Sequence, residues 1–368
     1  MPSIKLHSDI LLRPLQAASG IVERRNTLPI LGHVLLTVTQ QGLSVVATDL
    51  QLQITQHVHL DTTALGEMAV TVPARKLLDI LRALPPGELE LSHTGERLIL
   101  RRGGSRFSLQ TLAVETFHAM AQAAAFETRL SLPQKAFRQM LSRVHFAMAQ
   151  QDIRYYMNGM QLLVEDTQLS VVALDGCRLA WASLATEEGS PRHEAIVPRK
   201  TVLELLRLLT DSDDPLQIEI AGEQIRFSFG AIALVSKLID ARFPDVQRAI
   251  PRNYAHALTV AREPWLKALQ RVAILSSEKF RSVRFLVEPG RMTLRSNNGE
   301  RDEAEEELAI EYDGAGLEIG FNLNYLLDVL AQLETDSINL QLDQANLSAL
   351  LMLPGQDNYK YVAMALRN

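Results

Sequence analysis

Histidine, aspartate and cysteine are the residues of this chain whose spacing could support chemistry. His57 and His59 lie two residues apart in a probable strand, so both imidazoles would point to one face, as two metal ligands must. No third ligand is evident from the spacing. We therefore interpret the pair as exposed polar strand residues, and we expect no metal and no cofactor.

Two aspartates at matching places could form a carboxylate pair for acid–base catalysis. They are Asp49 in the segment ATDL and Asp175 in the similar segment ALDG. Turn formation explains both aspartates better, because a third related segment, RSNNG, carries asparagine at Asn297. Cys177 could be a nucleophile, yet no partner histidine is identifiable from the spacing. We therefore expect Cys177 to lie in a groove or in the core of the protein instead. The sequence has no nucleophile elbow, phosphate-binding loop, dinucleotide fingerprint or zinc spacing, so we predict that the protein is not an enzyme.

Length and composition predict a multidomain protein. The chain has 368 residues, of which 47% are hydrophobic, which suits two or three domains with buried cores. It has one cysteine, no pattern of a signal peptide and no run of about eighteen apolar residues, so we expect a soluble, cytoplasmic protein. The net charge of −6 argues against a nucleic-acid partner unless Lys and Arg are concentrated on one face.

A plan of about 125 residues occurs three times along the chain. Asp49 in ATDL, Asp175 in ALDG and Asn297 in RSNNG keep this period, as do Phe117 and Phe243. One segment is copied most clearly: TVPARKLLDILRAL at 71–84, IVPRKTVLELLRLL at 196–209 and IGFNLNYLLDVLAQL at 319–333. Each repeat should therefore hold the same elements in the same order.

Each repeat is predicted to contain two amphipathic helices and several short antiparallel strands, which is an α+β fold. Pro133 and Pro264 suit a first helical turn, Pro73 and Pro198 open their helices, and Pro14 suggests a later start or a kink. The helices are expected at 8–25, 73–83, 133–149, 198–209, 261–281 and 321–333.

The predicted helices are basic and the rest of the chain is acidic. These six segments hold 17 Lys or Arg and 7 Asp or Glu, whereas the remaining residues hold 20 and 36. Such a separation suits one face that attracts phosphate and an outer surface that repels stray nucleic acid. The alternative is that Arg and Lys simply decorate solvated helix faces.

Opposite charges also lie in the first and third repeats. Both runs could be charged strand edges that prevent aggregation. Because their signs are opposite, two chains could also meet head to tail and close into a ring. The basic run contains Arg97, Arg101, Arg102 and Arg106, and the acidic run contains Glu303, Glu305, Glu306 and Glu307.

Over its whole length the chain resembles the bacterial DNA polymerase III beta subunit, the sliding clamp family. The resemblance is specific because many short motifs occur in the family's order. They are NTLPILG at 26–32, TVPARK at 71–76, SRFSL at 105–109, QDIRYYMNGM at 151–160, LDGCRLA at 174–180, IVPRK at 196–200, ARFPD at 241–245, EKFRSVR at 278–284 and the terminal YVAMALR.

The resemblance implies three clamp domains, each with two helices packed on antiparallel sheets, and a head-to-tail dimeric ring. The domains would span 1–127, 128–253 and 254–368, with linkers near 119–128 and 250–257. The ring would encircle double-stranded DNA without reading its sequence and would give the replicative polymerase its processivity. Its other partners would be the clamp loader and repair proteins that carry short clamp-binding motifs.

The resemblance also carries three sets of functional residues onto this sequence. The DNA-binding residues would be Arg25, Arg75, Gln151, Tyr155 and Tyr156. The peptide groove would be formed by Met157, Leu174, Gly176, Cys177, Arg178, Leu179, Pro244, Arg248, Ala249, Val362, Met364, Ala365, Leu366 and Arg367. The dimer interface would use Lys76, Arg97, Arg102, Phe107, Leu109, Ile274, Leu275, Glu303 and Glu306.

Several alternatives remain open at this point. Tyr155 and Tyr156 could be ordinary core aromatics, and the groove residues could form a sealed core between two repeats, although chain ends seldom seal cores. Cys177, Ala365 and Asn368 differ from the family's usual residues, which puts its motif preference in doubt. The alternative function is a monomeric scaffold that binds peptides without enclosing DNA.

Overall fold

The computed structural model describes residues 3–22, 28–60, 67–121, 123, 125–251, 253–277, 281–298, 300–343, 345 and 347–366. These residues form two compact units. The first unit contains residues 1–135 and 203–238, and the second contains residues 136–202 and 239–368. Each unit therefore combines one outer repeat with part of the middle one, and the domain limits given by the sequence stay a prediction.

The larger sheet of the first unit takes strands from two repeats. Its eight antiparallel strands run in the order β5-β2-β3-β4-β14-β13-β12-β9. The repeats join where β4 pairs with β14, from Leu52 opposite Ser236 to Gln56 opposite Ile232. The strands are β2 (His33–Thr39), β3 (Gly42–Thr48), β4 (Leu52–Val58), β5 (Met68–Pro73), β9 (Thr128–Pro133), β12 (Pro215–Ala221), β13 (Gln224–Phe229) and β14 (Ile232–Lys237).

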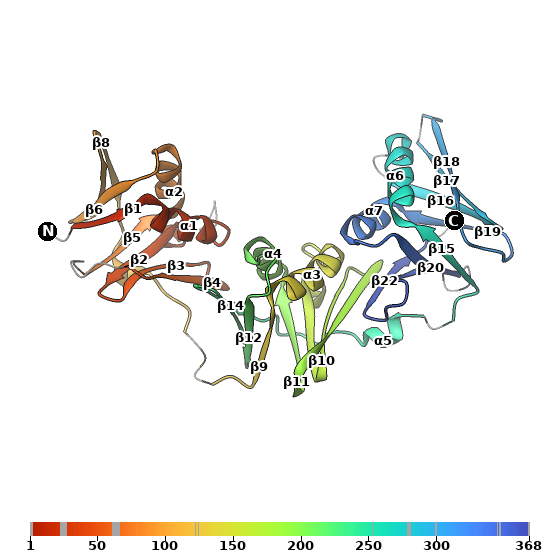
Figure 1. Ribbon diagram of the computed structural model, residues 1–368, viewed down its shortest axis with the longest axis horizontal. Coiled ribbons are helices and arrows are strands. Elements are labelled where there is room, and N and C mark those ends of the chain that lie inside the picture. Colours follow the sequence, from red (N-terminus) through yellow and green to blue (C-terminus); the bar gives the residue numbers. More distant parts are fainter. Residues whose placement is uncertain are drawn as a thin grey trace. The chain divides into compact units, whose positions relative to one another are not determined.

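The smaller sheet of the first unit has the order β1-β6-β7-β8, which leaves β8 at an edge. Helices α1 (Ser8–Ala18) and α2 (Ala74–Ala83) pack against each other beside the sheets (Figure 1). Their apolar faces are buried, as Leu11 and Leu77 illustrate. The strands are β1 (Ser3–His7), β6 (Glu88–Thr94), β7 (Arg97–Arg102) and β8 (Ser105–Gln110).

The larger sheet of the second unit also joins two repeats. Its antiparallel strands run in the order β10-β11-β22-β21-β20-β15. The junction is the pairing of β11 with β22, from Arg178 opposite Ala363 to Ala182 opposite Tyr359. The strands are β10 (Gly159–Leu174), β11 (Arg178–Pro198), β15 (His256–Ala261), β20 (Ser337–Asp343), β21 (Ser348–Met352) and β22 (Tyr359–Met364).

The remaining sheet has the order β18-β17-β16-β19, so β18 is an edge strand. Two helices of the third repeat, α6 and α7, pack against each other, and α6 also contacts β17 and β18. The strands are β16 (Ser282–Glu288), β17 (Arg291–Asn297), β18 (Glu303–Ala309) and β19 (Leu317–Asn322). The helices of the middle and third repeats are α3 (Gln134–Val144), α4 (Arg199–Leu208), α5 (Val246–Ala249), α6 (Arg262–Val272) and α7 (Leu323–Gln332).

The predicted α+β fold with two helices in each repeat is confirmed, but several helix limits are wrong. Helix α1 begins at Ser8 and continues through Pro14, which is buried together with Leu11 and Leu15, so of the predicted later start or kink the later start is not seen. The segment predicted as one helix over 261–281 is helical only to Val272, and a 3-10 turn at Ala273–Leu275 follows.

The recurring aspartates form turns, as predicted. Oδ1 of Asp49 accepts hydrogen bonds from the main-chain N–H groups of Gln51 and Leu52, at 2.9 and 2.7 Å. Oδ1 of Asp175 accepts from the N–H groups of Cys177 and Arg178, at 2.9 and 3.0 Å. Each carboxylate closes the loop between two strands and is not poised for catalysis.

A cluster of aromatic rings forms the core of the third repeat. Trp265 of α6 packs edge-on against Phe285 of β16, with ring centroids 6.1 Å apart. Phe285 also contacts Phe321 of β19 at 5.3 Å, and all three side chains are fully buried. Rings of this size contribute strongly to a core through buried area and edge-to-face packing.

We predict that Phe285→Ala lowers the free energy of unfolding of the second unit by about 3–5 kcal/mol, because it removes a buried ring and leaves a cavity. Tyr155→Ala is the matched control, since that aromatic side chain is 73% exposed. The control should change stability by less than about 0.5 kcal/mol. Denaturant unfolding of the free protein measures both, and similar values for the two variants would contradict the assigned core.

Candidate functional site

The predicted groove residues come together on the larger sheet of the second unit. Met157 lies in a 3-10 turn at Tyr155–Asn158, Leu174 ends β10, Leu179 follows the next turn and Val362 lies on β22. All four are buried in one apolar cluster with Phe243. The four side chains therefore form the floor of the site.

Other predicted groove residues form an exposed rim around this floor. Met364 and Leu366 are 49% and 42% exposed, and Cys177, Pro244, Arg248 and Ala249 are exposed as well. The rim is fixed by the main chain, because the N–H of Met364 donates to the carbonyl of Cys177 at 2.8 Å. Gly176 has a φ of 90° in this turn, a conformation that glycine adopts easily. Arg367 lies outside the described residues.

The structure therefore combines the two interpretations of these residues. The floor is sealed like a core, whereas the rim leaves apolar side chains at the surface. An apolar floor with a flexible methionine at its edge suits short linear motifs of differing sequence. Assignment of each side chain to peptide binding stays a prediction.

Arg178 joins the groove turn to a helix of the following repeat. Its Nε donates to Asp175 at 3.0 Å, Nη1 donates to Asp328 of α7 at 2.6 Å, and Nη2 donates to the carbonyl of Phe146 at 2.6 Å. The guanidinium also stacks on the ring of Tyr325, 4.5 Å from its centroid. All of these partners fix the position of Arg178, so it holds the turn in place. Its contact with a bound peptide stays a prediction.

Sequence reasoning missed the partners of Arg178. Asp328 lies 150 residues away in the chain, and no local pattern connects the two residues. Burial, together with the nearby Asp175 carboxylate, raises the pKa of Tyr325 to about 12. Tyr325 therefore stays a neutral phenol at physiological pH and presents an aromatic face to the cation.

Three of the residues predicted to touch DNA, Gln151, Tyr155 and Tyr156, lie on a loop whose conformation is held by hydrogen bonds. Asp152 accepts hydrogen bonds from the Arg154 main chain and from its guanidinium, at 2.8 and 2.9 Å. The guanidinium holds the pKa of Asp152 at about 2. Asn158 closes the loop by a pair of hydrogen bonds with the main chain of Asp152, both 2.8 Å. Gln151 opens the loop with a φ of 57°.

The two tyrosines of this loop have different environments. Tyr155 is 73% exposed, whereas Tyr156 packs on Phe243 with ring centroids 6.0 Å apart. Tyr155 is therefore available to a ligand, and Tyr156 belongs partly to the apolar cluster. Arg75 is half-buried, and its Nη2 donates to the carbonyl of Val22 at 3.1 Å. Arg25 lies outside the described residues.

The charged residues predicted at the dimer interface lie on three elements: Glu303 and Glu306 on edge strand β18, Arg97 and Arg102 on β7 next to edge strand β8, and Lys76 on α2. Lys76 and Arg97 are exposed, and Arg102 donates to the carbonyl of Pro86 at 2.5 Å. Glu303 is exposed, but Glu306 is paired within its own chain with Arg271, at 2.6 Å. The acidic run is thus partly neutralised by its own repeat.

The apolar residues predicted at the interface differ in exposure. Ile274 is 78% exposed, Leu275 and Phe107 are half-buried, and Leu109 is buried. Leu109 therefore belongs mainly to the core of its own sheet, and Ile274 is the clearest unpartnered apolar side chain of this set.

Two kinds of site are not found in the part of the chain that the structure describes. Among these residues, no group of three or more His, Cys, Asp or Glu side chains is arranged to hold a metal ion, and His57 and His59 therefore belong to no such group. No helix within the same residues has both the length and the apolarity that a membrane span requires.

Models of one protein family match the chain in three successive segments. The N-terminal domain of the DNA polymerase III beta subunit matches residues 3–121, the central domain matches 131–245 and the C-terminal domain matches 247–367. Together the three models cover nearly the whole chain in the order expected for the family.

Named relatives and solved structures agree with these models. The chain is 42% identical to the Beta sliding clamp of Pseudomonas putida over 98% of this chain and 99% of that one, and 41% identical to that of Escherichia coli K12 over 97% of each. It also matches a crystal structure of the DNA polymerase sliding clamp from Pseudomonas aeruginosa over the full length of both chains, with a TM-score of 0.95 and 40% identity. The sliding clamp from Caulobacter crescentus gives a TM-score of 0.91 at 37% identity, also over both full lengths. The chain therefore belongs to the DNA polymerase III beta subunit family, the beta sliding clamps.

Proposed function

We propose that two copies of this chain close head to tail into a ring around double-stranded DNA and tether the replicative polymerase to it. The protein is a DNA sliding clamp and not an enzyme, and we place its action in the cytoplasm. The observation that carries the ring is a rule of strand pairing between successive repeats.

In both junctions within the chain, the strand that follows the Asp49 or Asp175 turn of one repeat pairs with the last strand of the next. Strand β4 of the first repeat pairs with β14 of the second, and the corresponding part of β11 pairs with β22 of the third. Strand β18 holds the same place in the third repeat, and β8 is the last strand of the first. Both are edge strands in the described part of the single chain, so pairing β18 with β8 of a second copy continues the rule.

An internal contact supports the same pairing. After α3, Phe146 packs on Tyr361 of β22, with ring centroids 5.7 Å apart. Ile274 occupies the matching place after α6, and Phe107 occupies the matching place on β8. Ile274 is 78% exposed in the single chain, so contact with Phe107 of a second copy would bury it.

Electrostatics support DNA inside such a ring. The described helices present basic side chains at their surfaces: Arg13, Lys76, Arg82, Lys135, Arg138, Arg207, Lys267 and Arg271. Of these, Lys135, Arg207, Lys267 and Arg271 form ion pairs with carboxylates of their own chain. Helix α7 carries none, so the positive charge comes from the other helices. We assign Arg25, Arg75, Gln151, Tyr155 and Tyr156 to contacts with the duplex. Because a closed ring cannot leave a duplex sideways, weak phosphate contacts suffice and sliding stays free.

The groove on the second unit would hold the short motifs of polymerases, the clamp loader and repair proteins. Its buried floor and exposed rim support this assignment. A related clamp from Pseudomonas aeruginosa, which matches with a TM-score of 0.95, was solved bound to griselimycin. A monomeric scaffold is the alternative, but it leaves β8, β18 and Ile274 without a role.

We expect Ile274→Asp to weaken the dimer at least about tenfold, because it places a charge where an apolar contact is needed. Ile153→Asp is the matched control, since Ile153 is 89% exposed and belongs to neither edge strand. Analytical ultracentrifugation across a concentration series measures the dissociation constant. A wild-type mass of one chain at micromolar concentration would instead favour the scaffold.

The topological proposal predicts retention that depends on the shape of the DNA. Loaded clamps should stay on nicked circles at salt concentrations that abolish electrostatic binding, and they should leave when the circle is linearised. Gel filtration of labelled protein with each DNA measures retention. Equal loss from both substrates would rule out enclosure.

The groove assignment predicts that Met364→Glu reduces binding of a polymerase clamp-motif peptide at least about tenfold, because the charge disturbs an apolar rim. The dimer should remain intact. Leu28→Glu is the control, because Leu28 is 50% exposed and lies in the other unit. Fluorescence anisotropy measures the affinity, and equal affinities for the two variants would remove Met364 from the site.

A further inference from the structure

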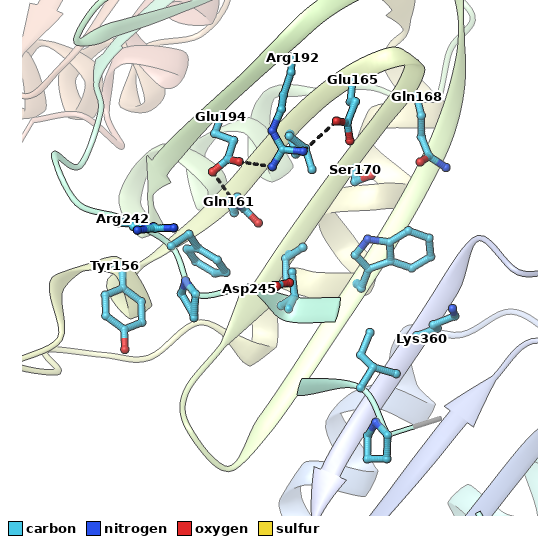
Figure 2. A pocket seen from close by; sticks show the side chains of 18 of the residues that line it. Tyr156, Gln161, Glu165, Gln168, Ser170, Arg192, Glu194, Arg242, Asp245 and Lys360 are labelled. Carbon is cyan, nitrogen blue, oxygen red and sulfur yellow. Dashed lines mark hydrogen bonds and ion pairs between the residues drawn. The ribbon is translucent and has the colours of Figure 1, made fainter. Parts of the chain in front are cut away.

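A second concave site lies on the same sheet of the second unit, beside the groove. It is a cavity of about 1060 Å³, which we call the trough (Figure 2). One end is apolar, and the other is formed by polar side chains of β10 and β11. Its lining includes Gln161, Glu165, Trp181, Arg192, Glu194 and Met352.

The apolar end of the trough is continuous with the floor of the groove. Val172, Phe243 and Leu350 line the trough and belong to the same buried cluster as Met157 and Val362. Trp181 and Met352 pack against this cluster. A chain lying in the groove could therefore continue over apolar surface into the trough.

Pro244 contributes to both places. It was assigned to the groove rim, and together with Val246 it lines the trough. The segment containing both residues thus forms a wall shared by the two sites. This shared wall makes a segment next to a groove-bound motif the most direct occupant of the trough.

The polar end of the trough is rich in hydrogen-bond acceptors. Arg192 donates to Glu165 at 2.8 Å and pairs on its other side with Glu194 (Figure 2). One guanidinium thus serves two carboxylates, so these three side chains together carry one net negative charge; Asp245, Arg242 and Lys360 also line the trough. A ligand with a cationic side chain complements that charge.

Gln161 gives a second, independent indication of a missing donor. The residue is only 5% exposed, and its Nε2 donates to Oε2 of Glu194 at 3.3 Å. A carboxylate can only accept, so this contact fixes the orientation of the amide. Within the described part of the chain, Oε1 of Gln161 has no hydrogen-bond partner. A buried acceptor without a donor is unfavourable, and a ligand N–H group would satisfy it.

We propose that the trough binds the residues that flank a clamp-binding motif, as an extended peptide segment with apolar and basic side chains. The apolar side chain packs on Trp181 and Met352. The basic side chain reaches Glu165 and Glu194, and a ligand N–H donates to Oε1 of Gln161. This inference rests on the proposed groove, because the motif in the groove brings its flank to the trough.

Synthetic peptides test the proposal directly. The probes are a polymerase clamp motif alone, the motif extended at either end by Leu-Lys-Leu-Lys, and the same extensions with Glu in place of Lys. One of the two Lys extensions should bind the wild-type protein about tenfold more tightly than the bare motif, and its Glu version should not. Fluorescence anisotropy at physiological salt gives each dissociation constant.

Two variants of the protein locate the effect. Glu165→Lys and Gln161→Met should each remove most of the gain from the Lys extension while the affinity for the bare motif is unchanged. Arg192 keeps Glu194 as a partner in both variants. The matched control is Glu288→Lys, because Glu288 shares Arg291 with Glu307 as Glu165 shares Arg192 with Glu194. It should lose nothing, which excludes a general effect of protein charge.

No gain from either Lys extension, or a gain that survives both trough variants, would overturn the trough proposal. An equal loss in Glu288→Lys would also overturn it, because it would reflect the overall charge of the protein. Failure of the bare motif to bind the wild-type protein would instead overturn the groove, so the two proposals can be tested separately.

Discussion

Main-chain pairing between repeats is the constraint on which the rest of this structure depends. A strand edge carries N–H and C=O groups that must be paired, covered or left in water. Within the chain, β4 and the start of β11 pair these groups with the last strand of the following repeat. This pairing makes one sheet out of two repeats. The middle repeat therefore cannot separate from either neighbour without losing a ladder of main-chain hydrogen bonds. It also defines the geometry that a partner of β8 and β18 must offer.

The groove is a consequence of the second of these junctions. Its floor needs Leu174 and Leu179 from the middle repeat and Val362 from the third. Pairing of β11 with β22 places Leu179 opposite Val362, and pairing of β10 with β11 places Leu174 opposite Leu179. Arg178 then connects the turn above the floor to Asp328 of α7. Because a buried guanidinium is costly unless its donors are paired, this network strongly favours one position of the turn. The binding surface is therefore preorganised by the same contacts that hold the two repeats together.

Local patterns in the sequence could predict much of this fold, and long-range contacts explain what they could not. The amphipathic helices leave a periodic signal within about twenty residues, and the three repeats with their turns at Asp49 and Asp175 recur at about 125 residues. Pro14 was misleading because a proline lacks the N–H that a helix interior needs, yet burial of Leu11 and Leu15 beside it outweighs that loss. Tyr155 and Tyr156 cannot be told apart locally, since only the packing of Phe243 decides which ring is covered. The trough has no sequence signal, because Gln161, Trp181 and Met352 come from three separate strands.

The proposed ring has three kinds of junction that are chemically similar but not equal in strength. Two lie within a chain, so the covalent connection keeps their strands at a high effective concentration. The junction between copies lacks that advantage and depends on protein concentration. Its acidic strand is also partly neutralised by its own chain, through Glu305 with Arg295 and Glu306 with Arg271. Such exposed ion pairs add little stability and leave less charge to attract a basic partner, so apolar contact at Ile274 and main-chain pairing must supply most of the affinity. The ring would therefore part between copies before it parts within a chain, which is where a loader would open it.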